Sequence, residues 1–510
     1  MLNTKGIVVF SGGSAANNLV DVFEAVRENK DCPLSYIIPI SDNGGSSSEL
    51  IRVFGGPGIG DLRSRLVRLI PTEPPSPERS AISSLFNHRL SATSLVDAAG
   101  EWQSIVAGTA ELWRGIPWAK KELIRSFFNL LNLEILKRSR PSSTFDFTSA
   151  SVGNLFLTGA RLFSGSIESA IYLLSSICAI PDGEVQVVPS INSNFSHHIA
   201  AGLANGEVIV GQNNISHPTA ATALDMPAVT VLPDTTTSHR IRHSVDHTEE
   251  IEDANIPGTH PSLRQRNIKF TKDEDEDLPA RIERIWYINP YGQEMLPPAN
   301  PRVILAIKDA QAIIYSIGSL YTSIIPSVVL KGVGEALRST PARHKILILN
   351  GSLDRETGPS SSPFTAFDFV EAIARAGEES RGNPWRLALH DSLSDETFTS
   401  SLATSATACR HDLLVPDTSA GPNLNTAGGD SIYRKYVTHV IHLSGEGAPR
   451  VDRDQLASLG IDCLKLYGRK SAKGLMLYDP QALVGAIEAI LGKKGDAMVL
   501  SRSRRNTYDG

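Results

Sequence analysis

The sequence predicts an α/β protein with a Rossmann-like, doubly wound and mainly parallel sheet that carries a helical insertion. Two observations support this fold class. Short β-branched segments alternate with longer helical patterns along the 510 residues, and several of these segments are apolar at nearly every position. Strands covered by helices on both faces show this pattern, and regular strand–helix alternation indicates a doubly wound topology.

The expected strands are spread along the whole chain. They are Gly6–Phe10, Ser35–Ile40, Val185–Ile191, Glu207–Gln212, Arg281–Ile288, Ala312–Ile317, Lys345–Asn350, Val437–Leu443 and Cys463–Tyr467. Helical patterns follow many of them, for example after Ser14, after Tyr321 and around Phe367–Ala376.

The clearest helix lies near the C-terminus, in DPQALVGAIEAILGKKG. Asp479 is the expected N-cap and Pro480 lies in the first turn, where a missing N–H is harmless. Leu483, Ile487, Ile490 and Leu491 share one face. This pattern predicts an amphipathic helix that covers the sheet.

Residues 1–492 are expected to form a single α/β domain. Three segments interrupt the alternation: a helix-rich insertion at 71–140, a polar and acidic loop at 239–279, and a loop-rich stretch at 358–430. The strongest amphipathic segment of the insertion is LIRSFFNLLNLEILKR. Residues 493–510 form a basic tail that we expect to be flexible.

Composition excludes several classes of protein. A net charge of −6 without a basic stripe argues against nucleic-acid binding. The four cysteines are far apart, which argues against a disulfide framework and a structural zinc site. The N-terminal apolar run is too short for a signal peptide, and glycine, hydroxyls and Pro326 interrupt the longest one, Ala312–Leu330. We therefore expect a cytoplasmic protein with no membrane partner.

The first candidate site is VVFSGGSAANNL, Val8–Leu19. A strand that runs into Gly12, Gly13 and Ser14 and then into a helix directs backbone N–H groups and a positive helix end at an anion. The stretch has no Walker lysine and no G-x-G-x-x-G, so neither standard nucleotide motif applies. A plain tight turn explains it about as well.

The second candidate site is SDNGGSSSELIRVFGGPGIGDLR, Ser41–Arg63. Asp42 follows an apolar strand, so it is expected at a carboxyl end of the sheet, where open α/β folds bind ligands. Asp61 follows a second glycine turn and could instead be a helix N-cap. Two acids on neighbouring loops beside a phosphate cradle match the way Mg²⁺ is held by carboxylates and substrate phosphates.

Two further stretches carry polar groups at predicted helix starts. In SVGNLFLTGARLF, Asn154 is either a ligand contact or a cap, and the residues alone favour the cap. In SIGSLYTSIIP, Ser316–Pro326, hydroxyls crowd the region Ser319–Ser323 after a strand. This cluster predicts a second anion site, with Ser/Thr capping as the alternative. The histidines show no metal-binding spacing, and the common hydrolase and kinase motifs are absent.

Taken in order, these motifs resemble those of the CofD/YvcK-like family. The set comprises the strand–GG–S start, D-x-G-G-S-S, G-D-x-R, S-x-G-N-L, G-Q-x-x-I at Gly211–Ile215, and G-S-L-Y-T-S-I-I-P. The resemblance spans residues 5–355 and includes the C-terminal helix. This family joins the 2-phospho-L-lactate transferases of deazaflavin coenzyme synthesis with the bacterial gluconeogenesis factors.

The resemblance implies a Rossmann-like fold with a ligand cleft at the strand ends, and two alternative functions. One is Mg²⁺-dependent transfer of a phosphate-containing group from a nucleotide diphosphate-activated donor. The other is a non-catalytic regulator of carbon metabolism that binds a nucleotide sugar or a dinucleotide. The expected partner is a nucleotide or nucleotide-activated small molecule. Assembly into a homo-oligomer is a further possibility.

The resemblance and the motifs together assign the site residues. Asp42 and Asp61 are the expected catalytic residues and Mg²⁺ ligands. The residues expected to contact nucleotide or phosphate are Gly12, Gly13, Ser14, Asn43, Gly44, Gly45, Arg63, Asn154, Gly318, Ser319, Tyr321, Thr322 and Ser323. Asn43 departs from the family, whose members tend to carry a second acid there, and SDNGGSSS and GSLYTSIIP look closer to the gluconeogenesis-factor branch.

Overall fold

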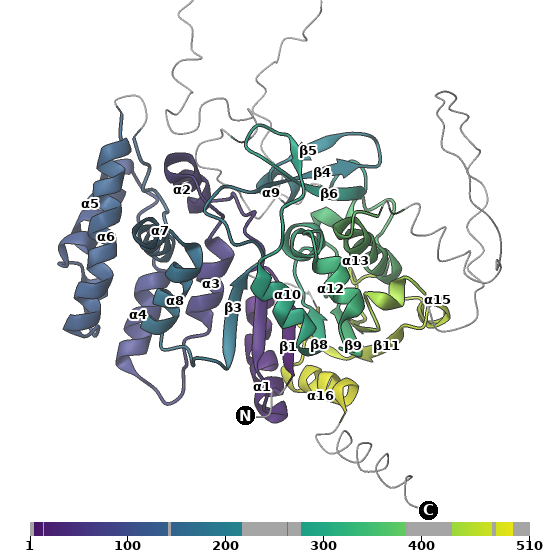
Figure 1. Ribbon diagram of the computed structural model, residues 1–510. Helices are drawn as coiled ribbons and strands as arrows, with labels where there is room; N and C mark the ends of the chain where they lie inside the picture. The colour runs from purple at the N-terminus through teal and green to yellow at the C-terminus, as the bar shows by residue number, and fades with distance from the viewer. Residues whose placement is uncertain are drawn as a thin grey trace, which may run out of the picture.

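A seven-stranded parallel sheet forms the centre of the protein in the computed structural model (Figure 1). The structure describes residues 5–13, 15–140, 144–216, 263, 277–383, 385, 431–471 and 476–492. The strand order is β11-β10-β9-β8-β1-β2-β3, and every neighbouring pair is parallel. The strands are β1 Gly6–Phe10, β2 Leu34–Ile38, β3 Val185–Pro189, β8 Ala310–Tyr315, β9 His344–Ile348, β10 His439–Leu443 and β11 Asp462–Leu466.

These seven strands confirm seven of the nine predicted segments, each to within two residues at either end. Their apolar composition has the expected cause, because helices cover both faces. In β1, for example, Ile7 to Phe10 are all buried. Burying side chains of this size stabilises the fold by about 1.5–3 kcal/mol each.

The strand order changes direction between β1 and β8. From β1 the chain moves outward to β2 and β3, and it later returns to β8 on the other side of β1 before continuing to β9, β10 and β11. In doubly wound folds the loops at the carboxyl ends of the strands diverge at such a switch point and leave a crevice for a ligand.

The helices that cover the sheet belong to both halves of the chain. Helix α1, Val20–Lys30, packs against the C-terminal α16, Pro480–Leu491, while α10, Pro301–Lys308, contacts β1, β3 and β8. The remaining helices of the second half are α11 Ile325–Val328, α12 Val333–Ser339, α13 Ala366–Ser380 and α15 Arg453–Ser458. The predicted cap of α16 is confirmed, since Asp479 Oδ1 accepts a hydrogen bond from the Ala482 N–H at 3.1 Å.

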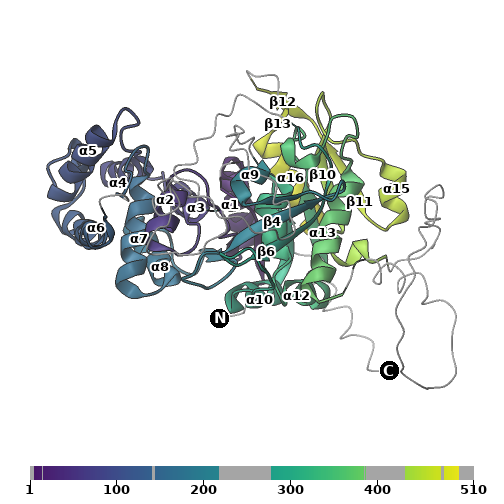
Figure 2. The same ribbon diagram turned by 90° about the horizontal axis from the view of Figure 1, so that it is seen from above.

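The described part of the chain between β2 and β3 is helical or loop, and it extends beyond the β3 edge of the sheet (Figures 1 and 2). Residues 71–140 form helices as predicted, and the segment expected to be strongly amphipathic lies in α6, which buries Ile124, Phe127, Phe128, Leu131 and Ile135. The helices are α2 Ser46–Phe54, α3 Gly60–Arg68, α4 Pro77–Asn87, α5 Leu95–Ala107, α6 Trp118–Arg138, α7 Val152–Ser164 and α8 Ile167–Ile177.

A second, antiparallel sheet with the order β5-β4-β6-β7 corrects the remaining two strand predictions. Glu207–Gln212 and Arg281–Ile288 contribute β5 and β6 to this sheet instead of the parallel one. β5 has one exposed and two half-buried residues, and β6 has two exposed residues, as expected where one face meets solvent. The sheet comprises β4 His198–Leu203, β5 Val208–Val210, β6 Ile282–Ile288 and β7 Glu294–Met295, and a separate hairpin pairs β12 Gly468–Lys470 with β13 Met476–Tyr478.

Some predictions lie outside the described residues. These are the basic tail 493–510, all but residues 263 and 277–279 of the acidic loop 239–279, and most of the loop-rich stretch beyond residue 385. Within the described ranges, no helix is long and apolar enough to cross a membrane.

Candidate functional site

A cleft of about 580 Å³ opens at the carboxyl ends of β1, β2 and β8, at the switch point of the sheet. It gathers residues from segments more than 300 positions apart in the sequence. Of the predicted site residues, those that line it are Gly12, Gly13, Asp42, Gly44, Gly45, Asp61, Arg63, Asn154, Gly318, Ser319, Thr322 and Ser323. Ser14 lies outside the described residues.

Asp42 lies in the loop after β2, and glycines enclose it. The Gly44 N–H donates to Asp42 Oδ1 at 2.9 Å, and the Ser47 hydroxyl approaches Oδ2 at 3.4 Å. A Cβ atom on Gly60 would lie 2.5 Å from Oδ2, and one on Gly58 would lie 2.1 Å from the Asp42 carbonyl oxygen. The second glycine turn is therefore glycine-rich because it packs directly against Asp42.

Asp61 lies in the first turn of α3 and faces the loop after β1. A Cβ atom on Gly13 would lie only 2.0 Å from Asp61 Oδ1, so the glycine allows the carboxylate to approach the loop. The N-cap position of α3 is Ile59. The alternative role of Asp61 as a simple N-cap is therefore wrong.

The two carboxylates perturb each other. Burial, followed by the negative charge of Asp42, raises the pKa of Asp61 to about 7. Burial also raises the pKa of Asp42, against hydrogen bonds from Gly44 and Ser47. Both side chains remain partly exposed where they face the cleft. Two like charges held this close favour either a proton or a cation between them.

Arg63 supplies positive charge next to the acids. Its Nε donates to Asn154 Oδ1 at 3.3 Å and its Nη1 to Asn87 Oδ1 at 3.1 Å, and both of these partners are neutral. Burial and the neighbouring Arg89, which also lines the cleft, lower the pKa of Arg63 to about 10. The two guanidinium groups can therefore offer their charge to an anionic ligand.

Asn154 joins three helices at the cleft. It accepts from Arg63 of α3, and its Nδ2 donates to the Ser46 hydroxyl at the start of α2 at 3.0 Å. Asn154 is the third residue of α7, whose N-cap position is Ser151. The cap favoured from the residues alone is therefore wrong, and Asn154 instead ties α7 to α2 and α3.

The starts of α2 and α3 both reach the cleft, although the N–H groups of Ser47 and Ser48 in α2 already donate to the Gly44 and Gly45 carbonyls. The N-cap residues of α2 and α3 are Gly45 and Ile59, whose side chains carry no hydrogen-bond acceptor. Both helices have their first residues in the cleft lining. Uncapped helix starts carry partial positive charge, which suits phosphate.

Arg65 holds the loop after β1 in place through hydrogen bonds. This fully buried side chain donates to the Gly12 carbonyl at 3.1 Å and to the Ser11 hydroxyl at 3.3 Å, and its guanidinium lies 4.3 Å from the centre of the Tyr36 ring. It follows Asp61 by one helical turn. This spacing of four residues places Arg65 and Asp61 on the same face of α3, and it is the feature of the sequence that could have identified Arg65.

The donor cluster predicted at Ser319–Ser323 is already engaged within the chain. The N–H groups of Tyr321 and Thr322 both donate to Glu356 Oε2 at 3.0 Å, and the Thr322 hydroxyl donates to Oε1. An internal carboxylate therefore occupies the helix start that was expected to bind an external anion. Tyr321 turns away from the cleft and donates its hydroxyl to the Ile282 carbonyl.

Asn43 lies behind the cleft instead of lining it. Its Oδ1 accepts a hydrogen bond from the Asn213 N–H at 3.0 Å, and the side chain is buried. Asn43 thus anchors the short helix α9, Gln212–Ser216, which carries Gln212, Asn213 and Ser216 into the cleft lining.

Several lining residues were not predicted. Arg89 follows α4 in a segment expected to be a mere insertion, and no local motif marks it. Gln212 was visible only as part of the G-Q-x-x-I segment. The full set of additions is Ala15, Ala16, Ser46, Ser47, Gly60, Ser64, Arg89, Gln212, Asn213, Ser216 and Ile317.

The donor set of the cleft fits a hard cation bound together with a phosphate. The described part of the chain contains no group of three or more His, Cys, Asp and Glu side chains that could hold a metal alone. Mg²⁺ commonly takes only one or two carboxylates and completes its shell with phosphate oxygens and water. Asp42 and Asp61 are the two carboxylates among the described lining residues.

Comparison with known proteins places the chain in a family. Residues 7–419 match the family described as 2-phospho-L-lactate transferase CofD. The chain belongs to the CofD family. Within this family it is 42% identical over 361 residues to an uncharacterized protein of Saccharomyces cerevisiae, covering 69% of this chain and 79% of that protein.

Other CofD relatives are bacterial. The gluconeogenesis factor of Bacillus subtilis is 23% identical over 368 residues, which cover 72% of this chain and 73% of that protein. A crystal structure from Bacillus halodurans, described as a member of the UPF0052 family, superposes with a TM-score of 0.51 at 17% identity and covers 95% of this chain and 99% of that one. That superposition supports the Rossmann-like fold.

Proposed function

We propose that this CofD-family protein binds a nucleotide diphosphate-activated compound together with Mg²⁺ and transfers its phosphate-containing group to an acceptor hydroxyl. One observation carries the proposal: Asp42 and Asp61 line the same cleft at the switch point and interact electrostatically, and Arg63 and Arg89 line it with them. Paired acids next to paired arginines suit a diphosphate bridged by a cation.

The residues of the cleft have two roles: some bind charged groups, and others orient the ligand. Asp42 and Asp61 hold the cation, and Arg63 and Arg89 contact phosphate oxygens. The N–H groups at the starts of α2 and α3 align the leaving phosphate. The bound Mg²⁺ supplies neutralisation of the charge that develops on the diphosphate during transfer.

In the transfer step, the acceptor oxygen forms a bond to phosphorus while the bond from phosphorus to the oxygen of the leaving nucleotide breaks. The acceptor proton passes to solvent. The arginines and helix N–H groups stabilise the charge on the leaving nucleotide, because they are already oriented before the reaction.

The departure at Asn43 is compatible with this chemistry. Since the Asn43 side chain bonds to Asn213 behind the cleft, a second acid at position 43 would not add a ligand there. The acid that accompanies Asp42 comes from Asp61.

The double variant Asp42→Asn with Asp61→Asn tests the proposal. Isothermal titration calorimetry with GDP, with and without Mg²⁺, should show Mg²⁺-dependent binding to the wild type and loss of that dependence in the variant, because neutral amides are poor Mg²⁺ ligands. Asp21→Asn, which alters an exposed acid on α1, serves as the control and should bind like the wild type. Unchanged Mg²⁺-dependent binding in the double variant would sink the assignment.

The second candidate function is regulation by ligand binding without turnover. It is favoured by relatives named gluconeogenesis factor. A thermal-shift screen with GDP, UDP-sugars and NAD(P) separates the two: Mg²⁺-dependent stabilisation by GDP favours the transferase, and stabilisation by a UDP-sugar alone favours the regulator.

A further inference from the structure

We propose that one wall of the cleft binds the hydroxyl groups of a sugar, and that Glu356 positions this wall from behind. The wall consists of Gln212, Asn213, Ser216, Ser319, Thr322 and Ser323, and we call it the neutral wall. The inference rests on the proposed function, since the sugar belongs to the nucleotide ligand. It adds a division of the cleft into a phosphate side and a sugar side.

The backbone of the neutral wall has few N–H groups left for a phosphate. The Gly318 N–H donates to Asn350 Oδ1 at 2.8 Å, and the Ser323 N–H donates to the Ser319 carbonyl at 2.9 Å. The N–H groups of Tyr321 and Thr322 donate to Glu356. Four neighbouring N–H groups at or beside the wall are therefore already engaged within the protein. Tight phosphate binding depends on N–H groups that are free to donate to the ligand.

The charges around the neutral wall also disfavour a phosphate there. Glu356 lies directly behind Thr322, whose hydroxyl donates to it, and the buried Asp354 lies close to Ser319. Asp354, and Glu356 once it is ionised above about pH 8, repel a phosphate placed against the wall. The arginines among the described lining residues, Arg63 and Arg89, belong to α3 and to the chain after α4 instead. Phosphate is therefore favoured on the α2–α3 side of the cleft.

The hydroxyls of the wall are oriented to accept hydrogen bonds. Thr322 gives its proton to Glu356 and Ser216 gives its proton to the Gln212 carbonyl, which leaves oxygen lone pairs for the ligand. Sugar hydroxyls are donors of matching chemistry. The amide side chains of Gln212 and Asn213 add groups that can both donate and accept.

Residues 354–357 hold the two halves of the wall together. This short turn, η5 (Arg355–Thr357), follows Asp354 and packs against both α9 and the π-helical turn η4, Leu320–Ile324. Arg355 Nε donates to the Ile215 carbonyl in α9 at 3.3 Å, while Glu356 binds η4. Glu356 is buried and does not line the cleft, so it acts as a positioning residue.

The test compares ligands with and without the sugar. GDP, 2′,3′-dideoxy-GDP and inorganic pyrophosphate are titrated with Mg²⁺ into wild type, Thr322→Val and Glu356→Gln, at pH 9, because burial and then Asp354 raise the pKa of Glu356 to about 8. Each variant should weaken GDP binding about three- to tenfold, as expected for one hydrogen bond, and change pyrophosphate binding less than about twofold.

The effect of each variant on each ligand shows which sugar the neutral wall binds. If Thr322 accepts from the ribose, Thr322→Val should not weaken dideoxy-GDP further, so the two deletions are non-additive. If a second sugar occupies the wall, the variant should instead weaken UDP-glucose relative to UDP. Either result supports the sugar side, and the two results name different sources of the hydroxyls.

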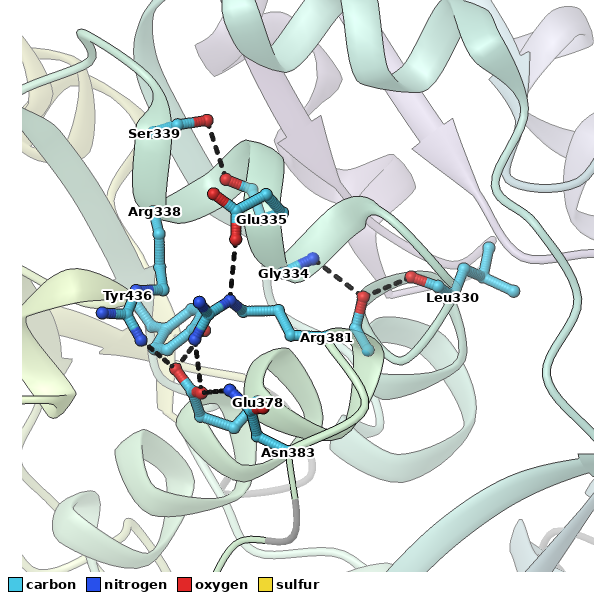
Figure 3. Close-up of polar contacts among 10 residues, drawn as sticks. Leu330, Gly334, Glu335, Arg338, Ser339, Glu378, Arg381, Asn383 and Tyr436 are labelled. Atoms are coloured by element: carbon cyan, nitrogen blue, oxygen red, sulfur yellow. Dashed lines mark hydrogen bonds and ion pairs between the residues drawn. The ribbon is translucent and has the colours of Figure 1, made fainter. Parts of the chain in front are cut away.

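Glu378 offers a matched control for a buried carboxylate. It is as buried as Glu356 but lies on α13, where it accepts hydrogen bonds from Arg338, Arg381, Asn383 and Tyr436 (Figure 3). Glu378→Gln should leave GDP affinity unchanged even if it lowers stability. A general loss of packing in Glu356→Gln would affect both variants alike.

Two outcomes overturn the inference: Thr322→Val weakening pyrophosphate as much as GDP, or Thr322→Val and Glu356→Gln leaving every nucleotide unaffected. Failure of the proposed function gives a different result. In that case Asp42→Asn with Asp61→Asn leaves Mg²⁺–pyrophosphate binding intact, whatever Thr322→Val does to GDP.

Discussion

At the scale of single residues, position in the sequence predicted which side chains gather but not what each one contacts. Asp42 and Asp61 follow glycine turns and do meet at the strand ends. Asn43 and Tyr321 stand in the same motifs, yet their side chains turn away from the cleft. The direction of a side chain in an irregular loop depends on packing with distant segments, which a local motif does not encode.

Glu356 illustrates a residue that no motif marked. Its partners, Tyr321 and Thr322, lie 35 and 34 positions earlier in the chain. The crowded hydroxyls correctly indicated a helix start that needs a negative partner. The sequence could not show that the partner would be a carboxylate of the same chain.

Two fully buried glutamates should respond to pH with opposite signs. Burial and Asp354 raise the pKa of Glu356 to about 8, so the folded state keeps a proton that the unfolded state loses, and stability falls as pH rises from about 5 to about 8. Burial also acts to raise the pKa of Glu378, but hydrogen bonds from Asn383, Tyr436 and Arg338 outweigh it and lower the pKa. Its contribution is therefore present above the unfolded pKa and lost in acid.

Urea unfolding at pH 5 and pH 8 measures this difference. Relative to the wild type, Glu356→Gln should gain stability between pH 5 and pH 8, on the order of 1–3 kcal/mol. Glu378→Gln should be destabilised at both values. A Glu356→Gln variant whose stability relative to the wild type does not change between the two pH values would show that Glu356 is ionised throughout.

At the scale of elements, the glycine turns explain how two acidic loops come into contact. Gly60 at the start of α3 leaves room for the carboxylate of Asp42, and Gly13 in the loop after β1 leaves room for that of Asp61. The strands that precede these loops were predictable because buried parallel strands have a continuous apolar pattern. The small antiparallel sheet was not assigned, since β4 contains Ala and Gly instead of a β-branched run.

Gly13→Ala should impair the site through this contact. The added methyl group would lie 2.0 Å from Asp61 Oδ1 and 2.8 Å from its Cγ, so the Asp61 side chain must move. We expect Mg²⁺-dependent GDP binding to weaken at least tenfold, and the free energy of unfolding to fall by about 1–3 kcal/mol. Calorimetry and urea unfolding measure the two effects.

Gly100→Ala is the matched control. Gly100 is exposed in α5, and a Cβ atom there would meet nothing within 4 Å. This variant should keep its GDP affinity and gain up to about 1 kcal/mol of stability from helix propensity. Equal binding by Gly13→Ala and Gly100→Ala would contradict the close packing of Gly13 and Asp61.

At the scale of the whole molecule, the doubly wound class followed from the alternation of strands and helices, but the location of the cleft did not. The switch point exists because β8 pairs with β1 although the two strands are separated by about 300 residues. No periodicity in the sequence records such a pairing. The ordered motifs that resemble the CofD family supplied this information instead, and the structure shows why they occur in separate segments.

The same pairing gives the site two chemically different sides. The chain between β1 and β3 supplies the acids, the arginines and the helix starts, whereas the chain after β4 supplies neutral amides and hydroxyls. A ligand that spans both sides must carry phosphate at one end and hydrogen-bonding groups at the other. A nucleotide-activated compound has this composition.

A crystal structure with Mn²⁺ and GDP would test the central claim most directly, since Mn²⁺ replaces Mg²⁺ and can be located by its anomalous signal. We expect one Mn²⁺ ion that is bound by both Asp42 and Asp61 and by a phosphate oxygen of GDP, with Arg63 on the diphosphate. GDP bound outside this cleft, or Mn²⁺ bound without either carboxylate, would contradict it.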